Sequence, residues 1–79
     1  MRVLLFSQAR DAVGAAELSL PLSEPASADE LWTQLLKAEP RLARLRPITR
    51  LARNGEYADA QTRFHDADEV ALIPPVSGG

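Results

Sequence analysis

Hydrophobic residues fall along this chain in short runs and alternations that predict strands, with one stretch of helical periodicity between them. Residues 2–7, RVLLFS, form a short apolar run that suits a buried strand. In residues 16–22 leucines alternate with other residues, which predicts a second strand ending near Pro21, since proline is confined to strand edges and ends. Residues 8–14 between them are expected to form a loop or a single helical turn. The first two strands then form a hairpin.

Residues 27–40 carry the clearest helix signal. Ser27 and Glu30 have the S-x-x-E spacing of a capping box, in which each side chain accepts a hydrogen bond from the other residue's backbone N–H. Apolar residues recur at positions 31, 35 and 38, which share one helix face. Pro40 ends the helix, because the residue before a proline is pushed out of the helical region.

The second half of the chain predicts a short helical turn and three more strands. Leu42 and Leu45 are expected to face inward from one further turn before Pro47. Asn54-Gly55 is a strong hairpin signal between a third and a fourth strand, because both positions tolerate positive φ. The last strand covers residues 70–73. Four or five strands and one main amphipathic helix predict an α+β domain.

The first and last strands are apolar on both faces, whereas one helix covers only one face of a sheet. The second apolar face therefore needs another cover, or it remains an exposed patch of the kind that marks partner sites. Phe6 and Ile73 are the large apolar side chains predicted at its centre. Periodicity alone leaves core packing open for both residues.

Composition narrows the possible functions. A chain of 79 residues forms one domain at most, and its lack of cysteine excludes disulfides and thiolate nucleophiles. With a single histidine, His65, and no cysteine, we expect no metal site. A net charge of −2 argues against non-specific nucleic-acid binding. The apolar run of residues 3–6 is too short for a membrane span or a signal peptide, so we expect no membrane association and a cytoplasmic protein.

Few residues offer independent catalytic chemistry. The chain has neither a G-x-x-x-x-G-K-[ST] loop nor a G-x-G-x-x-G motif. Its serines lack a base other than His65, which we interpret as a loop residue. The acidic residues at 66, 68 and 69 favour a solvated turn over a cation site. The arginines between 41 and 53 indicate either a solvated surface or electrostatic steering toward an acidic partner.

The last six residues, PPVSGG, have the composition of an arm that projects from the domain, so we divide the chain into a domain at 1–73 and a tail at 74–79. Two prolines favour an extended conformation, and two glycines allow a narrow partner site to enclose the backbone. The group carried at the end is the carboxylate of Gly79. A carboxylate is a poor electrophile, and its activation, for example as an acyl-adenylate, requires a partner that binds ATP.

Three segments resemble the small subunit of molybdopterin synthase, a family of ubiquitin-like sulfur carriers. They are VLLFSQARDAVG at 3–14, LARNGEYA at 51–58 and, above all, DADEVALIPPVSGG at 66–79. Ala67 stands where the family often has glycine, and Arg53 where it often has an apolar residue. The resemblance covers essentially the whole chain. It implies a β-grasp fold with a mixed sheet of four to five strands and one main helix packed on one face.

The resemblance also implies a mechanism and partners. An E1-like adenylyltransferase would use ATP to adenylate Gly79, and a sulfur donor protein would convert the adenylate to a thiocarboxylate. The large synthase subunit would take up the tail and direct the sulfur to cyclic pyranopterin monophosphate. The chain itself would bind no cofactor, and the assembly would be a heterotetramer. The tail residues implied to act in carrying sulfur and binding partners are Pro74, Pro75, Val76, Ser77, Gly78 and Gly79.

Two other functions stay open. The chain could be a sulfur carrier for thiazole synthesis or tRNA thiolation, which use the same chemistry at the terminal carboxylate. It could also be a ubiquitin-like interaction module that is never activated. An independent enzyme has little support from the residues above.

Overall fold

A computed structural model describes residues 1–75 of the 79-residue chain. The elements, in chain order, are β1 (Arg2–Leu5), α1 (Ser7–Val13), β2 (Glu17–Ser19), α2 (Ala28–Ala38), the 3-10 helix η1 (Pro40–Ile48), β3 (Arg50–Arg53), β4 (Glu56–Tyr57) and β5 (Glu69–Ile73). The strands form one five-stranded sheet in the order β2-β1-β5-β3-β4. The pair β1 and β5 is parallel and the other pairs are antiparallel, so the predicted mixed sheet is confirmed.

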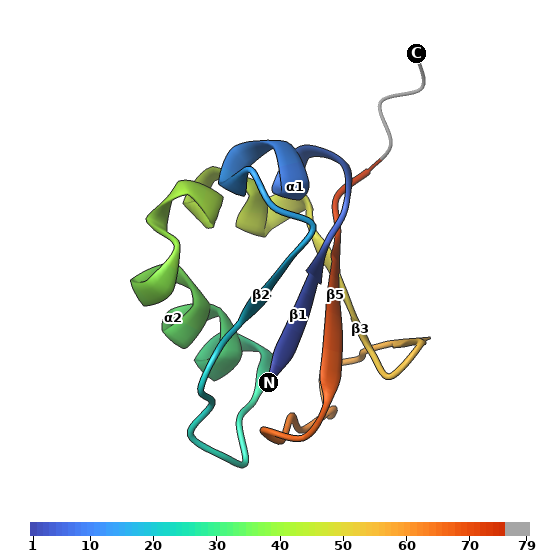
Figure 1. Cartoon of the computed structure of the whole chain (residues 1–79). Helices are drawn as coiled ribbons and strands as arrows, with labels where there is room; N and C mark the ends of the chain where they lie inside the picture. Colours follow the sequence, from blue (N-terminus) through green and yellow to red (C-terminus); the bar gives the residue numbers. More distant parts are fainter. Residues whose placement is uncertain (76–79) are drawn as a thin grey trace.

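The helical segments lie to one side of the sheet, at the left and top of Figure 1, and β5 runs between β1 and β3. The capping box of α2 is present: Glu30 N donates to Ser27 Oγ at 3.1 Å, and Ser27 N donates to Glu30 Oε1 at 2.9 Å. The hydrogen bond from the Ser27 backbone lowers the pKa of Glu30. These bonds satisfy backbone donors that would otherwise lack partners at the start of the helix.

The core lies between the helical segments and the inner face of the sheet. β1 and β5, the paired central strands, contribute alternate residues to it, because successive side chains of a strand point to opposite faces. Side chains with relative exposures of 0–2% include Val3, Leu5, Leu31, Leu35, Leu42, Phe64, Val70 and Leu72. Leu42 and Leu45 of η1 face inward as predicted. Phe64 is fixed there by two backbone hydrogen bonds with Ala26, at 2.8 and 2.9 Å.

The predicted Asn54-Gly55 hairpin is confirmed. The two residues have φ values of 50° and 88°, and they join β3 to β4. Positive φ at both central positions is the geometry of the tight turn that matches the twist of paired strands. The turn places Tyr57 opposite Ala52.

Three elements differ from the sequence prediction. The residues between β1 and β2 form a seven-residue helix, α1, rather than a loop or one turn, and Gly14 ends it at φ 81°. β2 is shorter than expected and ends at Ser19, although Leu20 N still donates to Met1 O at 2.9 Å. The single turn expected near Leu42 is a nine-residue 3-10 helix that contains Pro47. Three helical segments, α1, α2 and η1, therefore cover the inner face of the sheet together.

Candidate functional site

The sheet face turned away from α2, called here the exposed sheet face, carries its side chains in three rows set by the strand register. The row farthest from the tail holds Arg2 of β1 beside Glu69 of β5. The middle row is apolar over much of its length, and its members are Glu17, Leu4, Ala71, Ala52 and Tyr57. The row at the tail end holds Ile73 of β5 beside Arg50 of β3.

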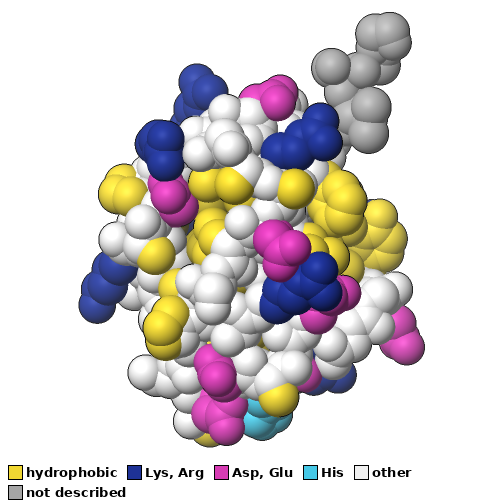
Figure 2. All heavy atoms as spheres, in the orientation of Figure 1, with side chains coloured by type: hydrophobic (Ala, Val, Ile, Leu, Met, Phe, Trp, Pro, Cys, Tyr) yellow, Lys and Arg dark blue, Asp and Glu magenta, His cyan; other side chains and the backbone are white. Residues whose placement is uncertain are grey.

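The middle of the exposed sheet face is hollowed. The hollow has a volume of about 330 Å³ and is lined by Leu4, Phe6, Ala52, Gly55, Tyr57, Glu69, Ala71 and Ile73. Phe6 is 47% exposed and Tyr57 is 57% exposed. Figure 2 shows hydrophobic side chains gathered at the right of the view, directly beside acidic and basic ones. Several large apolar side chains exposed around one hollow are typical of a surface that binds a partner.

The structure decides which way the two predicted docking residues face. Phe6 caps the N-terminus of α1 with extended backbone, and its carbonyl accepts hydrogen bonds from Ala9 N and Arg10 N. Alternation from Val3 onward turns Phe6 to the same face as Leu4, so it lies at the edge of the hollow instead of in the core. Ile73 also lines the hollow, whereas its neighbour Leu72 is fully buried on the opposite face. Contact of Phe6 and Ile73 with a partner stays a prediction.

Pro74 lies differently from what the sequence indicates. We expected it to begin the projecting tail, but its side chain is less than 2% exposed. The alternation of β5 explains this, because residues 70, 72 and 74 share the inner face. Pro74 thus belongs to the domain, and Pro75 is the first exposed residue after it. The remaining predicted site residues, Val76, Ser77, Gly78 and Gly79, lie outside the described part of the chain.

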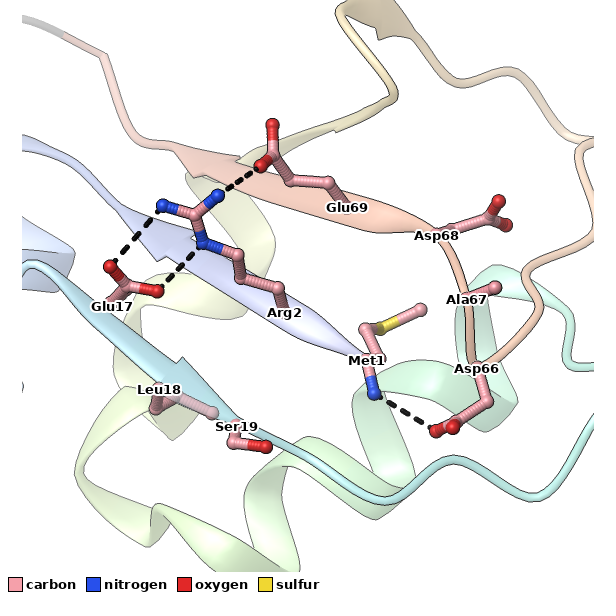
Figure 3. Close-up of a pocket in the computed structure, with 9 residues that line it drawn as sticks. All are labelled: Met1, Arg2, Glu17, Leu18, Ser19, Asp66, Ala67, Asp68 and Glu69. Atoms are coloured by element: carbon pink, nitrogen blue, oxygen red, sulfur yellow. Dashed lines mark hydrogen bonds and ion pairs between the residues drawn. The ribbon is translucent and has the colours of Figure 1, made fainter.

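An ion cluster borders the hollow at the end away from the tail. Figure 3 shows Arg2 lying between Glu17 of β2 and Glu69 of β5. Arg2 Nε donates to Glu17 Oε2 at 2.7 Å, and Arg2 Nη1 donates to Glu69 Oε2 at 2.9 Å. The hydrogen bond and charge of Glu17 raise the pKa of Arg2, and the same bond lowers the pKa of Glu17. Two carboxylates and one guanidinium leave this exposed cluster with a net negative charge.

A cation borders the hollow at the tail end. The guanidinium carbon of Arg50 lies 3.8 Å from the centroid of the Tyr57 ring. Such stacking is attractive because the ring face carries partial negative charge. The backbone of Arg50 is paired with Ile73 in the register of β3 and β5, and its side chain reaches across to the Tyr57 ring on β4.

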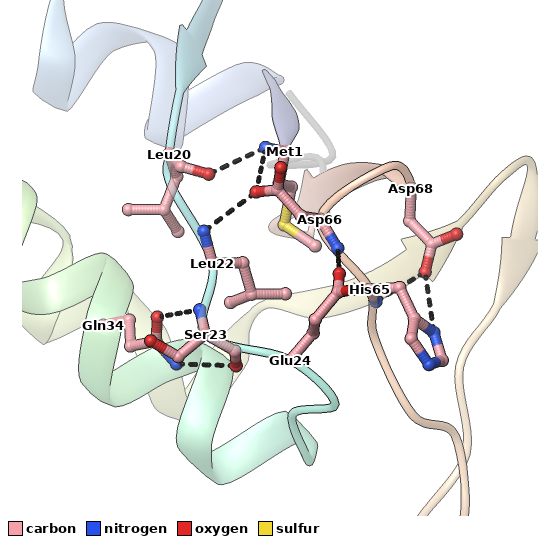
Figure 4. A network of polar contacts seen from close by, with 9 residues as sticks. All are labelled: Met1, Leu20, Leu22, Ser23, Glu24, Gln34, His65, Asp66 and Asp68. Carbon is pink, nitrogen blue, oxygen red and sulfur yellow. Dashed lines mark hydrogen bonds and ion pairs between the residues drawn. The ribbon is translucent and has the colours of Figure 1, made fainter.

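The acidic residues at the turn before β5 act as hydrogen-bond acceptors. The Met1 ammonium donates to Leu20 O at 2.8 Å and to Asp66 Oδ1 at 2.9 Å, and Leu22 N donates to the same oxygen at 2.9 Å (Figure 4). The bonds from the Met1 ammonium and Leu22 lower the pKa of Asp66. Asp68 accepts from His65 N at 2.9 Å. Within residues 1–75, no three potential ligands are grouped to hold a metal ion.

His65 lies in this same turn, as predicted for a loop residue, with Nδ1 3.9 Å from Asp68 Oδ2. Two of the arginines that cluster in the sequence are paired with carboxylates of the described residues. Arg41 pairs with Glu39, and Arg46 pairs with Asp29 at 2.8 Å. Steering of an acidic partner by the others stays a prediction.

Tyr57, a large side chain that lines the hollow, is not among the residues predicted from the sequence. The Asn54-Gly55 signal could have located Tyr57, because a two-residue hairpin fixes which residues are opposite each other. No helix among residues 1–75 has the length and apolar character needed to cross a membrane.

The five-stranded mixed sheet, the helix that crosses it and the apolar exposed face define a small ubiquitin-like β-grasp protein. The structure is similar to that of SAMP1 from Haloferax volcanii, with a TM-score of 0.84, 29% identity and coverage of 100% of this chain and 98% of that one. The fold also matches a chain in the complex of subunits 1 and 2 of molybdopterin-converting factor from Helicobacter pylori, with a TM-score of 0.65, 23% identity and coverage of 99% and 96%.

The chain belongs to the ThiS family, whose model matches residues 3–79. It is 36% identical to the molybdopterin synthase sulfur carrier subunit of Chlamydomonas reinhardtii over 100% of this chain and 98% of that protein. It is 34% identical to the protein of the same name from Arabidopsis thaliana, over 100% of this chain and 82% of that protein. The resemblance noted from the sequence is confirmed.

Proposed function

We propose that this chain is the sulfur carrier of a molybdopterin synthase and that it carries the sulfur on the carboxylate of Gly79. The strongest support is sequence similarity: the chain is 36% and 34% identical to two molybdopterin synthase sulfur carrier subunits over its whole length. The exposed apolar hollow, which Phe6 and Ile73 line, agrees with the proposal, since a carrier must bind a partner.

The carrier cycle begins with activation by a partner. An E1-like adenylyltransferase joins the Gly79 carboxylate to the AMP part of ATP, and pyrophosphate leaves. Sulfide sulfur from a donor protein then attacks the acyl carbon and AMP leaves, which gives a thiocarboxylate. The chain lacks phosphate-binding loop motifs, so the partner supplies the ATP site.

The second half of the cycle takes place on the large synthase subunit. That subunit binds the hollow around Phe6 and Ile73 and takes up the residues after Pro74. The thiocarboxylate sulfur then replaces an oxygen substituent on a carbon of cyclic pyranopterin monophosphate, and water cleaves the acyl carbon–sulfur bond, which leaves the sulfur on the pterin and returns Gly79 as a carboxylate. Two charged carriers are used because a dithiolene has two sulfurs. The complex of subunits 1 and 2 from Helicobacter pylori supports such a partner, and we expect a heterotetramer.

The test is reconstitution from purified components. The charged chain, the large synthase subunit and cyclic pyranopterin monophosphate should form molybdopterin. Deletion of Gly79 should abolish product while leaving the melting temperature unchanged, and a chain extended past Gly79 should not be charged. Product from the Gly79 deletion would refute the carboxylate proposal. A charged chain that yields no molybdopterin would point to thiazole synthesis or tRNA thiolation.

Similarity to a small archaeal modifier protein favours one further candidate, in which the activated carboxylate is attacked by an amine and forms an amide. The two functions differ in the nucleophile. Incubation of the activated chain with either a sulfide source or lysine-containing proteins separates them. A covalent protein conjugate that resists thiols and hydroxylamine would favour the modifier function.

A further inference from the structure

The hollow on the exposed sheet face lies between charges of opposite sign. Arg50 is at the tail end, beside Ile73, and the cluster of Glu17, Arg2 and Glu69 is at the other end. Glu17 of β2 and Arg50 of β3 are three strands apart in the sheet, so their backbones are separated by roughly 14 Å at about 4.8 Å per strand. The side chains between them are apolar.

We propose that these two charges fix the direction in which a protein partner docks, and hence the direction in which the tail enters it. The partner is a protein surface that places an apolar side chain in the hollow. It offers a carboxylate to Arg50 and a lysine or arginine to the Glu17 end. The inference rests on the proposed function, and the partner that it concerns is the large synthase subunit.

Arg50 is suited to receive a carboxylate. Its guanidinium carbon lies 3.8 Å from the centroid of the Tyr57 ring, and a guanidinium placed over a ring keeps its N–H donors at the edge of its plane. Among residues 1–75, no carboxylate lies within 4.0 Å of it. A planar guanidinium held in this way can bind a carboxylate through two parallel hydrogen bonds.

The opposite end is suited to receive a cation. Arg2 neutralises only one of the two carboxylates that it contacts, so the cluster keeps a net negative charge. All three side chains are more than 40% exposed. The charge is therefore accessible to a partner from the solvent.

The separation of the charges makes them act as two distinct signals. The screening length at physiological ionic strength is about 8 Å, which is shorter than the distance between the two ends. A partner turned end for end would meet like charges at both ends. An apolar hollow alone gives no such distinction, because hydrophobic contact is not directional. Exposed charges at the border of an interface act mainly on the association rate and its salt dependence.

The experiment measures association of the purified chain with the large synthase subunit by stopped flow at low and high salt. Arg50→Gln removes a positive charge and Glu17→Gln removes a negative one. We expect both to slow association, by about two- to fivefold at low salt, the change that exposed ion pairs typically produce. Both rates should converge on the wild-type rate at high salt.

Matched controls are Arg44→Gln and Asp11→Asn, which remove the same charges from exposed positions on η1 and α1. If only the net charge of the chain matters, Arg50→Gln and Glu17→Gln will change the association rate in opposite directions, and each will match its control. That result would overturn the inference. Ile73→Asp tests the proposed docking separately: if it weakens binding while Arg50→Gln and Glu17→Gln match the controls, only the directional inference fails. No binding by the wild type would instead refute the proposed function.

Discussion

Leu72 and Ile73 are neighbours on β5 whose side chains point to opposite faces of the sheet, and their truncation should have opposite consequences. Leu72 is 0% exposed and is paired with Leu5 and Leu51, which also face the core. Ile73 lines the exposed hollow. Leu72→Ala should therefore damage stability, and Ile73→Ala should damage docking.

The magnitudes follow from burial. Truncation of a fully buried leucine to alanine costs about 2–5 kcal/mol, because it removes transfer free energy and leaves a cavity. In a domain of this size, 1 kcal/mol shifts the melting temperature by about 4–8 °C, so a loss of about 3 kcal/mol lowers it by roughly 12–24 °C. Ile73→Ala should cost about 1 kcal/mol in stability, since its side chain is only partly buried in the free chain.

Docking should respond in the reverse order. Truncation of an apolar anchor at the centre of an interface typically costs about 2 kcal/mol, which is roughly a thirtyfold loss of affinity. Leu72→Ala should leave the affinity of the folded molecules within about threefold of wild type.

The assay combines urea unfolding, followed by circular dichroism, with calorimetric binding to the large synthase subunit at a temperature where both variants are folded. Equal losses of stability in the two variants would assign Ile73 to the core. A larger loss of affinity in Leu72→Ala than in Ile73→Ala would refute the assignment of the two faces.

Three further predictions concern the fold. Ser27→Ala removes one half of the capping box and should cost about 1 kcal/mol in urea unfolding, whereas an unchanged midpoint would show that the cap does not contribute. Gly55→Ala places a Cβ at φ 88° and should cost about 1–2 kcal/mol, and a stabilised variant would contradict the turn geometry. The pKa of Asp66 is lowered in the folded chain, so its bond to the Met1 ammonium stabilises the fold above the unfolded pKa of about 3.9. This contribution is lost as the pH falls through the pKa that Asp66 has in the folded chain. Asp66→Asn should thus destabilise at pH 6 and progressively less below pH 4, unlike the exposed control Asp11→Asn; a difference from wild type that does not change with pH would refute this linkage.

Features that depend on neighbouring residues were readable from the sequence. The capping box at Ser27 needs only two residues at fixed spacing, and the Asn54-Gly55 turn needs only two that tolerate positive φ. The alternation in β1 and β5 also predicted that one apolar face would lack helical cover. These signals hold because the interactions behind them span a few residues.

Features set by contacts between distant segments were not readable. α1 has only seven residues, too few for its periodicity to be recognised. The burial of Pro74 follows from the continued alternation of β5, which a proline-rich composition concealed. The charges on either side of the hollow depend on strand order, because Arg2, Glu17 and Glu69 are adjacent only after β2, β1 and β5 are paired.

The most direct test of the central claim is the intact mass of the chain after incubation with an E1-like adenylyltransferase, ATP and a sulfur donor. A carrier should gain the mass difference for one oxygen replaced by one sulfur, and fragmentation should locate that change at Gly79. The change should disappear when ATP is omitted. An unchanged mass, under conditions that charge an established carrier, would contradict the claim and leave the chain as a binding module.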